Sequence, residues 1–338
     1  MNLADYSELV VKPYLPETLV SRESWEKLRK LKAHFPSTIT DFWGYECRLS
    51  AKKDTDILFC INKDQKGFTV DNIANLVAIS KDWENIAYFL KKWQSKTDSF
   101  SHQINNLWLE FDSEVMEDKS PIPSLFFAPN VRSYEEFVSL YQDFSNTIGL
   151  NFDEKTLSFY AHVVTTLPYG AWIPQVGFML ARTREHIRFY VHGLSKEGII
   201  QFLKKNNWKG NLSNLEKIVV HLSQYARVID LDIDLSEEGI SNKIGLECYF
   251  EEGALHHPKF RTFLQFLVST GFCSQEKMWA LFSYYGEINS CFSEDMRSFL
   301  GDVPLITCRR FVHHIKISYE GDNALEAKVY LGLIKEFI

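Results

Sequence analysis

The sequence lacks the segments that would direct it to a membrane or to nucleic acid. No run in the 338 residues approaches the ~18 consecutive apolar residues of a membrane-spanning helix. The first residues, MNLADYSELVVKPYLPETL, are acidic where a secretory signal is basic, and they have no apolar core. Acidic residues outnumber basic ones by 44 to 37, so no net positive charge attracts phosphate backbones or anionic lipid. We therefore expect a soluble, cytoplasmic protein that binds neither nucleic acid nor membrane.

Cysteine patterns and common catalytic motifs are also missing. The six cysteines are scattered without a CxxC pair, which favours reduced cytosolic thiols over a zinc knuckle or a disulfide framework: Cys47, Cys60, Cys248, Cys273, Cys291 and Cys308. The sequence contains no GxGxxG, GxxxxGK[ST], HExxH or GxSxG. Two histidine pairs remain, His256–His257 and His313–His314. Adjacent strand residues point to opposite faces, and the first pair precedes a helix, so we expect core or surface histidines rather than metal ligands.

Aromatic residues are abundant instead. The chain has 26 Phe, 15 Tyr and 8 Trp, with 45% hydrophobic and 24% charged residues, which excludes a disordered or low-complexity protein. Its length suits two average domains or one large barrel or α/β unit.

Strand-like segments recur in five pairs, each joined by a short polar stretch and read as an antiparallel hairpin. The pairs are Tyr45–Leu49 with Ile57–Ile61, Leu107–Phe111 with Leu125–Ala128, Val176–Arg182 with Ile187–His192, Val228–Leu235 with Ile244–Phe250, and Phe311–Ser318 with Ala327–Leu331.

Helical segments lie between most of these hairpins. We expect helices over Val20–His34, Ile79–Gln94, Ser133–Ile148, Ser195–Asn207, Ser213–Tyr225 and His257–Thr270. Ser133 with Glu136, and Ser213 with Glu216, have the capping-box spacing, and Pro258 suits a first helical turn. The architecture of a strand pair followed by helix therefore repeats five times.

Ten antiparallel strands in five consecutive pairs have one economical closure. We predict an α/β fold in which a ten-stranded antiparallel barrel of five ββ repeats is surrounded by helices, because closure leaves no open sheet edge. One domain spans residues 1–338, with the barrel over about 43–332 and a helical N-terminal extension over 1–42. The outward strand positions are apolar and the inward ones polar, as in Leu107, Leu109 and Phe111 against Trp108, Glu110 and Asp112. The same alternation also describes a flat sheet with one wetted face.

A charged residue followed two positions later by tyrosine recurs on the second strand of successive pairs. The three copies are Arg188-x-Tyr190, Glu247-x-Tyr249 and Lys328-x-Tyr330. Together with the five paired strands, this pattern resembles the ABBA prenyltransferases, over roughly residues 43–332. Glu247 departs from the family's pattern, which usually has a cation at that place.

The resemblance implies a transferase that moves a dimethylallyl or longer prenyl group from its diphosphate to an aromatic acceptor. Arg188, Lys316 and Lys328 would then bind the diphosphate, and Tyr190, Tyr249 and Tyr330 would shield the allyl cation. The acceptor would be an indole or phenol, either a small natural product or a side chain of a ribosomally made peptide (RiPP). Each of these residues also has a plainer interpretation: ordinary packing for the tyrosines, and ion pairs with Glu247, Asp232 or Glu110 for the cations.

Glu110 and Trp108 are our candidates for handling the acceptor. Glu110 can act as a base or orient an N–H or O–H, and the neighbouring Trp108 can stack on an aromatic ring. The alternative is that Glu110 only neutralises a cation across the barrel. In the resembled family a glutamate of an early repeat often acts on an indole nitrogen.

Metal use stays open at this stage. Asp230, Asp232 and Asp234 alternate along a strand, so all three can face the lumen and hold Mg²⁺ against a diphosphate, or they can form a solvated face at the barrel mouth. The DDxxD and NDxxD clusters of helical prenyl-transfer enzymes are missing. Some members of the resembled family work without metal. We expect a monomer or homodimer, and the rival function is a non-catalytic barrel that binds a peptide or apolar ligand.

Overall fold

The computed structural model describes residues 1–65, 68–118, 120–131, 133–182, 184, 186–251, 257–289 and 306–337. Cys291 and His256 lie outside these ranges. The other five cysteines are buried and free. Within the described ranges, no helix combines the length and the apolar character that crossing a bilayer requires.

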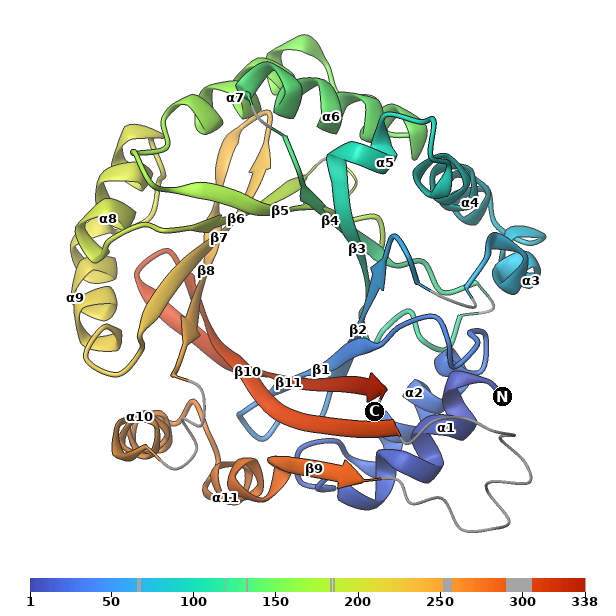
Figure 1. Ribbon diagram of the computed structural model, residues 1–338. Coiled ribbons are helices and arrows are strands. Elements are labelled where there is room, and N and C mark those ends of the chain that lie inside the picture. Colours follow the sequence, from blue (N-terminus) through green and yellow to red (C-terminus); the bar gives the residue numbers. More distant parts are fainter. Residues whose placement is uncertain are drawn as a thin grey trace.

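The strands form a closed ring that is the centre of the molecule (Figure 1). The described strands are β1 (Phe42–Arg48), β2 (Thr55–Asn62), β3 (Ile104–Phe111), β4 (Ser124–Pro129), β5 (Trp172–Phe178), β6 (Ile187–His192), β7 (Val228–Ser236), β8 (Gly239–Tyr249), β9 (Gly286–Asn289), β10 (Ile306–Glu320) and β11 (Asn323–Phe337). Strands β1 to β8 follow one another around the ring, β10 and β11 complete it, and β11 pairs with β1. The predicted ten-stranded antiparallel barrel is thus confirmed, with β9 added alongside the first residues of β10.

One strand is displaced from its predicted position. The sequence favoured Val176–Arg182, whereas β5 ends at Phe178 and the chain turns over the next residues. Backbone hydrogen bonds from Leu180 to Phe178 and from Arg182 to Met179 close that turn. The apolar run Met179–Leu180 continued the strand pattern, but the turn brings Arg182 back against the neighbouring hairpin.

The helices surround the ring and cover its outer face (Figure 1). They are α1 (Leu3–Val10), η1 (Lys12–Tyr14), α2 (Arg22–Lys32), η2 (Val70–Ile73), α3 (Ala74–Val77), α4 (Lys81–Gln94), α5 (Phe100–Gln103), α6 (Tyr134–Thr147), α7 (Glu154–Thr165), α8 (Lys196–Lys205), α9 (Leu212–Leu222), α10 (Pro258–Ser269) and α11 (Gln275–Tyr284). The side chain of Ser133 accepts from the backbone N–H of Glu136 and caps α6, as predicted. The predicted cap Ser213 is wrong: α9 already begins at Leu212, because Asn211 accepts from the N–H of Asn214.

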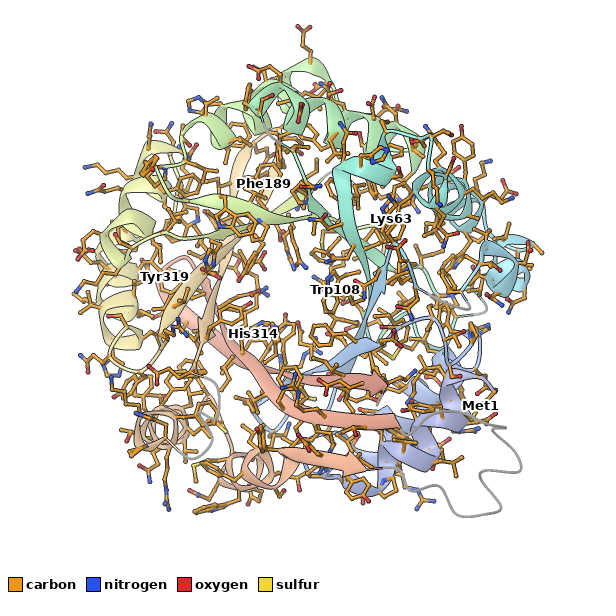
Figure 2. The ribbon with its side chains drawn as sticks, in the orientation of Figure 1. Met1, Lys63, Trp108, Phe189, His314 and Tyr319 are labelled. Atoms are coloured by element: carbon orange, nitrogen blue, oxygen red, sulfur yellow. The ribbon has the colours of Figure 1, made fainter. Side chains whose placement is uncertain are left out.

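The hydrophobic core lies between the ring and the helices. Leu107, Leu109 and Phe111 of β3 point outward and are at most 1% exposed. Phe189 of β6 packs outward on Phe137 and Tyr160, with ring centres 5.8 and 6.2 Å apart, whereas Trp108 and His314 point into the ring (Figure 2). Much of the phenylalanine content therefore seals helices onto the barrel.

The N-terminal helices complete this outer layer over β1. Trp25 of α2 lies 6.5 Å from the Tyr45 ring, and Tyr6 of α1 lies 6.2 Å from the Trp43 ring. Lys32, at the end of α2, is fully buried here. Its Nζ lies 3.7 Å from the Trp25 ring centre and has no hydrogen-bond partner. Burial lowers the pKa of Lys32 from 10.5 to about 7, against the attraction of Glu8 and with the help of the nearby Lys12.

Replacing Lys32 with methionine is expected to stabilise the protein at neutral pH. The ammonium of the unfolded chain titrates near 10.5, so the cost of the buried charge grows as the pH falls from 10.5 to about 7 and is constant below that. At about 1.4 kcal/mol per pKa unit, Lys32→Met should raise the free energy of unfolding at pH 7 by ~4 kcal/mol, measured by urea titration. The gain should shrink towards pH 10.

The control is Lys30→Met on the exposed side of the same helix, where Lys30 is paired with Glu117 at 2.7 Å. This substitution should change the free energy of unfolding by less than ~1 kcal/mol at either pH. A Lys32→Met gain that is the same at pH 7 and pH 10 would contradict the assignment of the cost to a buried charge.

Candidate active site

A cavity of about 370 Å³ lies in the lumen of the barrel. Its volume suits a small organic ligand. The lining comes from all ten strands of the ring, and consists of Phe42, Gly44, Leu58, Asn105, Asn106, Trp108, Glu110, Phe126, Ala128, Pro129, Trp172, Pro174, Gln175, Arg188, Tyr190, Asp232, Glu247, Tyr249, His313, His314, Lys316, Tyr330, Leu331 and Gly332. Most of the predicted site residues are therefore brought together, although they come from distant parts of the sequence.

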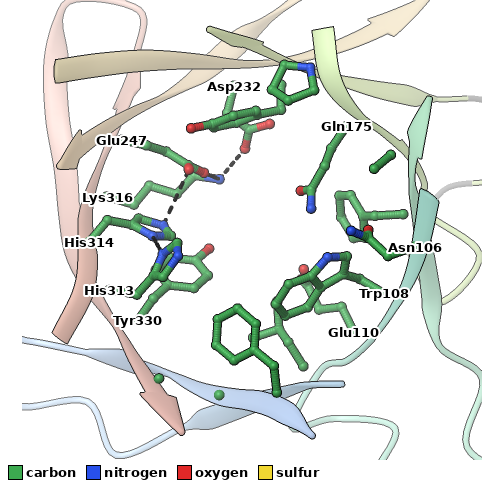
Figure 3. Close-up of a pocket in the computed structure, with 18 of the residues that line it drawn as sticks. Asn106, Trp108, Glu110, Gln175, Asp232, Glu247, His313, His314, Lys316 and Tyr330 are labelled. Atoms are coloured by element: carbon green, nitrogen blue, oxygen red, sulfur yellow. Dashed lines mark hydrogen bonds and ion pairs between the residues drawn. The ribbon is translucent and has the colours of Figure 1, made fainter. Parts of the chain in front are cut away.

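One side of the cavity is aromatic. Phe42 and Trp108 meet edge to face with ring centres 5.0 Å apart, and Figure 3 shows Trp108 projecting into the open space. Phe126 lies over Gly177, where an added Cβ would come within 2.4 Å of its ring. The glycine thus makes room for an aromatic ring inside the barrel. Apolar rings of this kind make that side of the lumen unfavourable for water and favourable for an apolar ligand.

The three predicted tyrosines all line the cavity. Tyr190 and Tyr249 touch through their hydroxyls at 2.9 Å, and Tyr330 stacks on His314 with ring centres 4.0 Å apart. Burial, followed by nearby carboxylates, raises the pKa of all three phenols well above the usual value. They are neutral at physiological pH, and a neutral aromatic ring attracts a cation at any face that it leaves uncovered.

His313 and His314 both line the cavity, against the expectation that neighbouring strand residues face opposite ways. The reason is a β-bulge in β10, where the pairing with β11 shifts between Val312 and His314. The two Nδ1 atoms lie 2.7 Å apart, and both side chains are in Figure 3. Burial lowers the pKa of His313 to about 4, and burial together with His313 and Lys316 lowers that of His314 well below its usual range. Both rings are therefore neutral near pH 7.

Arg188 and Lys316 line the cavity, and each is bound to carboxylates. Arg188 makes a bidentate pair with Asp234 at 2.7 and 2.9 Å, and lies 3.6 Å from Asp232. Lys316 donates to Asp232 and lies 3.5 Å from Glu247 (Figure 3). Burial opposes both positive charges, but the carboxylates outweigh it and raise the pKa of each group. The two cations are fixed at the wall and stay charged.

Lys328 is not among the residues that line the cavity. It donates to Glu46 at 2.8 Å and lies 3.6 Å from Glu326. Tyr330 donates to the other oxygen of Glu46. Burial opposes the charge of Glu46, yet Lys328 and Arg48 hold its pKa well below the usual range. Of the three predicted diphosphate ligands, only Arg188 and Lys316 reach the cavity.

Glu110 lies on the lining beside Trp108 and is held by Arg182 at 2.8 Å. The turn after β5 places Arg182 there, where it also pairs with Asp112. Burial raises the pKa of Glu110 despite the attraction of Arg182, with Glu46 and Asp112 adding to the rise. One oxygen of Glu110 is thus engaged by a cation.

The three alternating aspartates of β7 have separate partners. Asp234 is bound to Arg188, Asp232 to Lys316, and Asp230 to Tyr190 and His192. Among the described residues, no three His, Cys, Asp or Glu side chains are grouped so as to hold a metal ion. With these partners in place, Asp230, Asp232 and Asp234 are not grouped as the Mg²⁺ site that their spacing suggested.

Sequence reasoning missed several residues of the site. Asn106 and Gln175 present amides to the cavity (Figure 3). Gln175 was not expected, because the predicted strand began one residue later, at Val176, whereas β5 begins at Trp172. Glu46 was overlooked as well. Its neighbours Tyr45 and Cys47 are fully buried, and the alternation of a strand then turns the side chain of Glu46 towards the lumen.

A closed ring of ten antiparallel strands around a polar lumen, with helices outside, is the fold of the ABBA prenyltransferases. A solved structure with this fold is AnaPT from Neosartorya fischeri, an ABBA prenyltransferase. The match covers 99% of this chain and 86% of that one, with a TM-score of 0.51 and 16% identity. No family model matches the chain, and no curated protein matches its sequence. At this identity the likeness establishes the fold.

Proposed function

We propose that the chain transfers a prenyl group from its diphosphate to an aromatic acceptor inside the barrel. The observation that carries the proposal is the cavity of the lumen, which combines neutral aromatic rings with the fixed cations Arg188 and Lys316. The fold shared with AnaPT supports it.

The chemistry requires both kinds of side chain. When the allylic carbon–oxygen bond breaks, the electron pair leaves with the diphosphate, and buried cations stabilise the charge that develops on its oxygens. The allyl cation left behind reacts with water unless water is excluded. Neutral phenol faces exclude it and attract the cation by roughly 0.5–2 kcal/mol per ring. Tyr190, Tyr249 and Tyr330 take this part in the proposal.

The acceptor would occupy the aromatic side of the cavity. Trp108 stacks on an indole or phenol ring, and Glu110 orients the acceptor N–H or O–H. The amides of Asn106 and Gln175 offer further hydrogen bonds at the same wall. Both a small aromatic metabolite and an indole or phenol side chain of a peptide satisfy this description.

One observation favours a second candidate, a non-catalytic barrel that binds a peptide or apolar ligand. Among the described residues, five cations in and around the lumen are already paired with carboxylates: Arg48–Asp56, Arg182–Glu110, Arg188–Asp234, Lys316–Asp232 and Lys328–Glu46. A diphosphate must compete with these carboxylates and adds negative charge to an acidic lumen. The two candidate functions therefore differ most clearly in whether a diphosphate can replace these carboxylates as the partner of Arg188 and Lys316.

Incubation with labelled dimethylallyl diphosphate and a panel of tryptophan- and tyrosine-containing acceptors, with and without Mg²⁺, tests the proposal. Mass spectrometry should detect acceptors that have gained a prenyl group. Trp108→Ala should raise KM for the aromatic acceptor roughly tenfold or more, because the stacking of a planar ring on an aromatic side chain contributes ~1–3 kcal/mol to binding in nucleic-acid complexes. The matched control is Trp279→Ala, at a tryptophan that is 51% exposed on α11. Binding of an apolar ligand without turnover of any diphosphate would favour the second candidate.

A further inference from the structure

A series of five hydrogen-bonded side chains leads from the cavity to the barrel mouth. Glu247 Oε2 accepts from the hydroxyl of Tyr249 at 3.1 Å, and the Tyr249 hydroxyl lies 2.9 Å from that of Tyr190. Tyr190 in turn contacts one oxygen of Asp230, and His192 Nδ1 lies 2.9 Å from the same oxygen. Glu247 lines the cavity and is 7% exposed, whereas the His192 side chain is 41% exposed. We call these five residues the relay.

The number of protons that the relay holds determines whether it can transfer one. Three oxygen–oxygen contacts separate Glu247 from Asp230, and each needs one proton to be a hydrogen bond. The two phenols supply two. A third proton, taken up by Glu247, is needed to fill all three contacts at once. Transfer of each of the three protons to the neighbouring oxygen reverses all three hydrogen bonds and moves the extra proton from Glu247 to Asp230, and rotation of the phenol hydroxyls then resets the series.

The surroundings of Glu247 suit a group that gains and loses a proton near neutral pH. Burial raises its pKa to about 7, Lys316 opposes the rise, and Asp232 adds to it. Lys316 lies 3.5 Å from Oε1, and the neutral His314 has its Nε2 3.3 Å from Oε2 without hydrogen-bond geometry. A base works best when its pKa is close to the working pH.

We propose that Glu247 accepts the proton released by the aromatic acceptor and that the relay carries it to solvent at His192. This inference rests on the proposed prenyl transfer. The allylic carbon–oxygen bond breaks with its electron pair on the diphosphate, and the acceptor atom bonds to the allylic carbon with its own electron pair. The acceptor's hydrogen leaves as a proton to Glu247, and the electrons of that bond restore the aromatic ring. Asp230 passes a proton to His192, the phenols each pass one along, and Glu247 is again a carboxylate.

Glu110 has a different part under this assignment. Its partner is the guanidinium of Arg182, which does not release protons at neutral pH. Glu110 can hold and orient an acceptor N–H or O–H, but its bonded neighbour cannot carry a proton away. A buried carboxyl group that accepts a proton in every turnover needs a route that returns the proton to solvent, and the relay supplies one.

Turnover measurements on Tyr190→Phe test the outlet. The substitution removes one hydroxyl and retains the aromatic ring. The value of kcat should therefore fall roughly tenfold or more, while its dependence on pH, which reports the protonation of Glu247, should persist. A small permeant base such as imidazole should restore part of the rate. Tyr319→Phe, whose hydroxyl bonds to the backbone of Asn211 at 3.3 Å, is the matched control and should behave as the wild type. If the wild type transfers the prenyl group and Tyr190→Phe is as fast as Tyr319→Phe, the relay is refuted and the proposed function stands.

Infrared titration of the unliganded protein tests the relay independently of turnover. The carbonyl stretch of a protonated carboxyl group should disappear above about pH 7 and be missing in Glu247→Gln. Its frequency should change in Tyr190→Phe and Asp230→Asn, which are remote from Glu247 but share its proton, and not in Tyr319→Phe. A Glu247 signal that is identical in Tyr190→Phe and the wild type would refute the relay even if no prenyl transfer is ever found.

Discussion

Arg188→Ala and Asp234→Asn should change prenyl diphosphate binding in opposite directions. Arg188 is held by Asp234 through two hydrogen bonds, at 2.7 and 2.9 Å. Removing the guanidinium should weaken binding of the diphosphate roughly 100-fold, because a buried charge-assisted contact of this kind contributes ~2–3 kcal/mol. Neutralising Asp234 frees the guanidinium and removes a competing negative charge, so binding should tighten about tenfold. Isothermal titration calorimetry with a non-hydrolysable dimethylallyl diphosphate analogue measures the affinity of both variants.

The opposite signs separate a binding cation from a structural one. If the Arg188–Asp234 pair only stabilises the barrel, both substitutions lower the melting temperature and neither changes diphosphate affinity selectively. The matched control is Asp71→Asn, at an exposed aspartate of η2. It should leave affinity and melting temperature unchanged. Equal weakening of binding by Arg188→Ala and Asp234→Asn would contradict the assignment of Arg188 to the diphosphate.

Lys316→Met should destabilise the barrel more than any surface substitution. Lys316 pairs with Asp232 and lies 3.5 Å from Glu247, and all three are at most 7% exposed. Without the ammonium, two buried carboxyl groups lose their cation, which should lower the free energy of unfolding by ~3–5 kcal/mol at pH 8. The loss should be smaller at pH 5, where the carboxyl groups can take up protons that relieve the unpaired charge. Urea titration at both pH values measures it.

The double variant Lys316→Met with Asp232→Asn is the control for this prediction. It removes both partners of the ion pair and should recover part of the stability that the single variant loses. A loss that is equal at pH 5 and pH 8, and that Asp232→Asn does not reduce, would show that Lys316 contributes through packing and not through its charge.

The alternation along the strands was enough to predict the barrel and its polar lumen. In β3 the odd-numbered residues Leu107, Leu109 and Phe111 form the face that contacts helices. The even-numbered residues Trp108 and Glu110 form the face that lines the lumen. This signal depends only on the two-residue period of a strand, which local sequence carries. The missed strand β9 has four residues, too few for such a pattern.

The partners of the lumenal charges could not be predicted, because they depend on register. Arg188 lies opposite Asp234, and Lys316 opposite both Glu247 and Lys328. A shift of one residue would exchange these neighbours and turn every side chain to the other face. The register is set by turns and bulges, such as the one at Val312 and His314, that composition does not reveal.

The central claim is that the lumen is the site of prenyl transfer, and the most direct test is to block it. Ala128 lines the cavity, and Ala128→Trp would place a large ring in its 370 Å³. We predict that the wild type binds the dimethylallyl diphosphate analogue in a saturable manner, and that Ala128→Trp loses this binding while its circular dichroism spectrum and melting transition remain those of a folded barrel. Saturable binding of equal affinity in a folded Ala128→Trp variant, or no binding by the wild type, would contradict the claim.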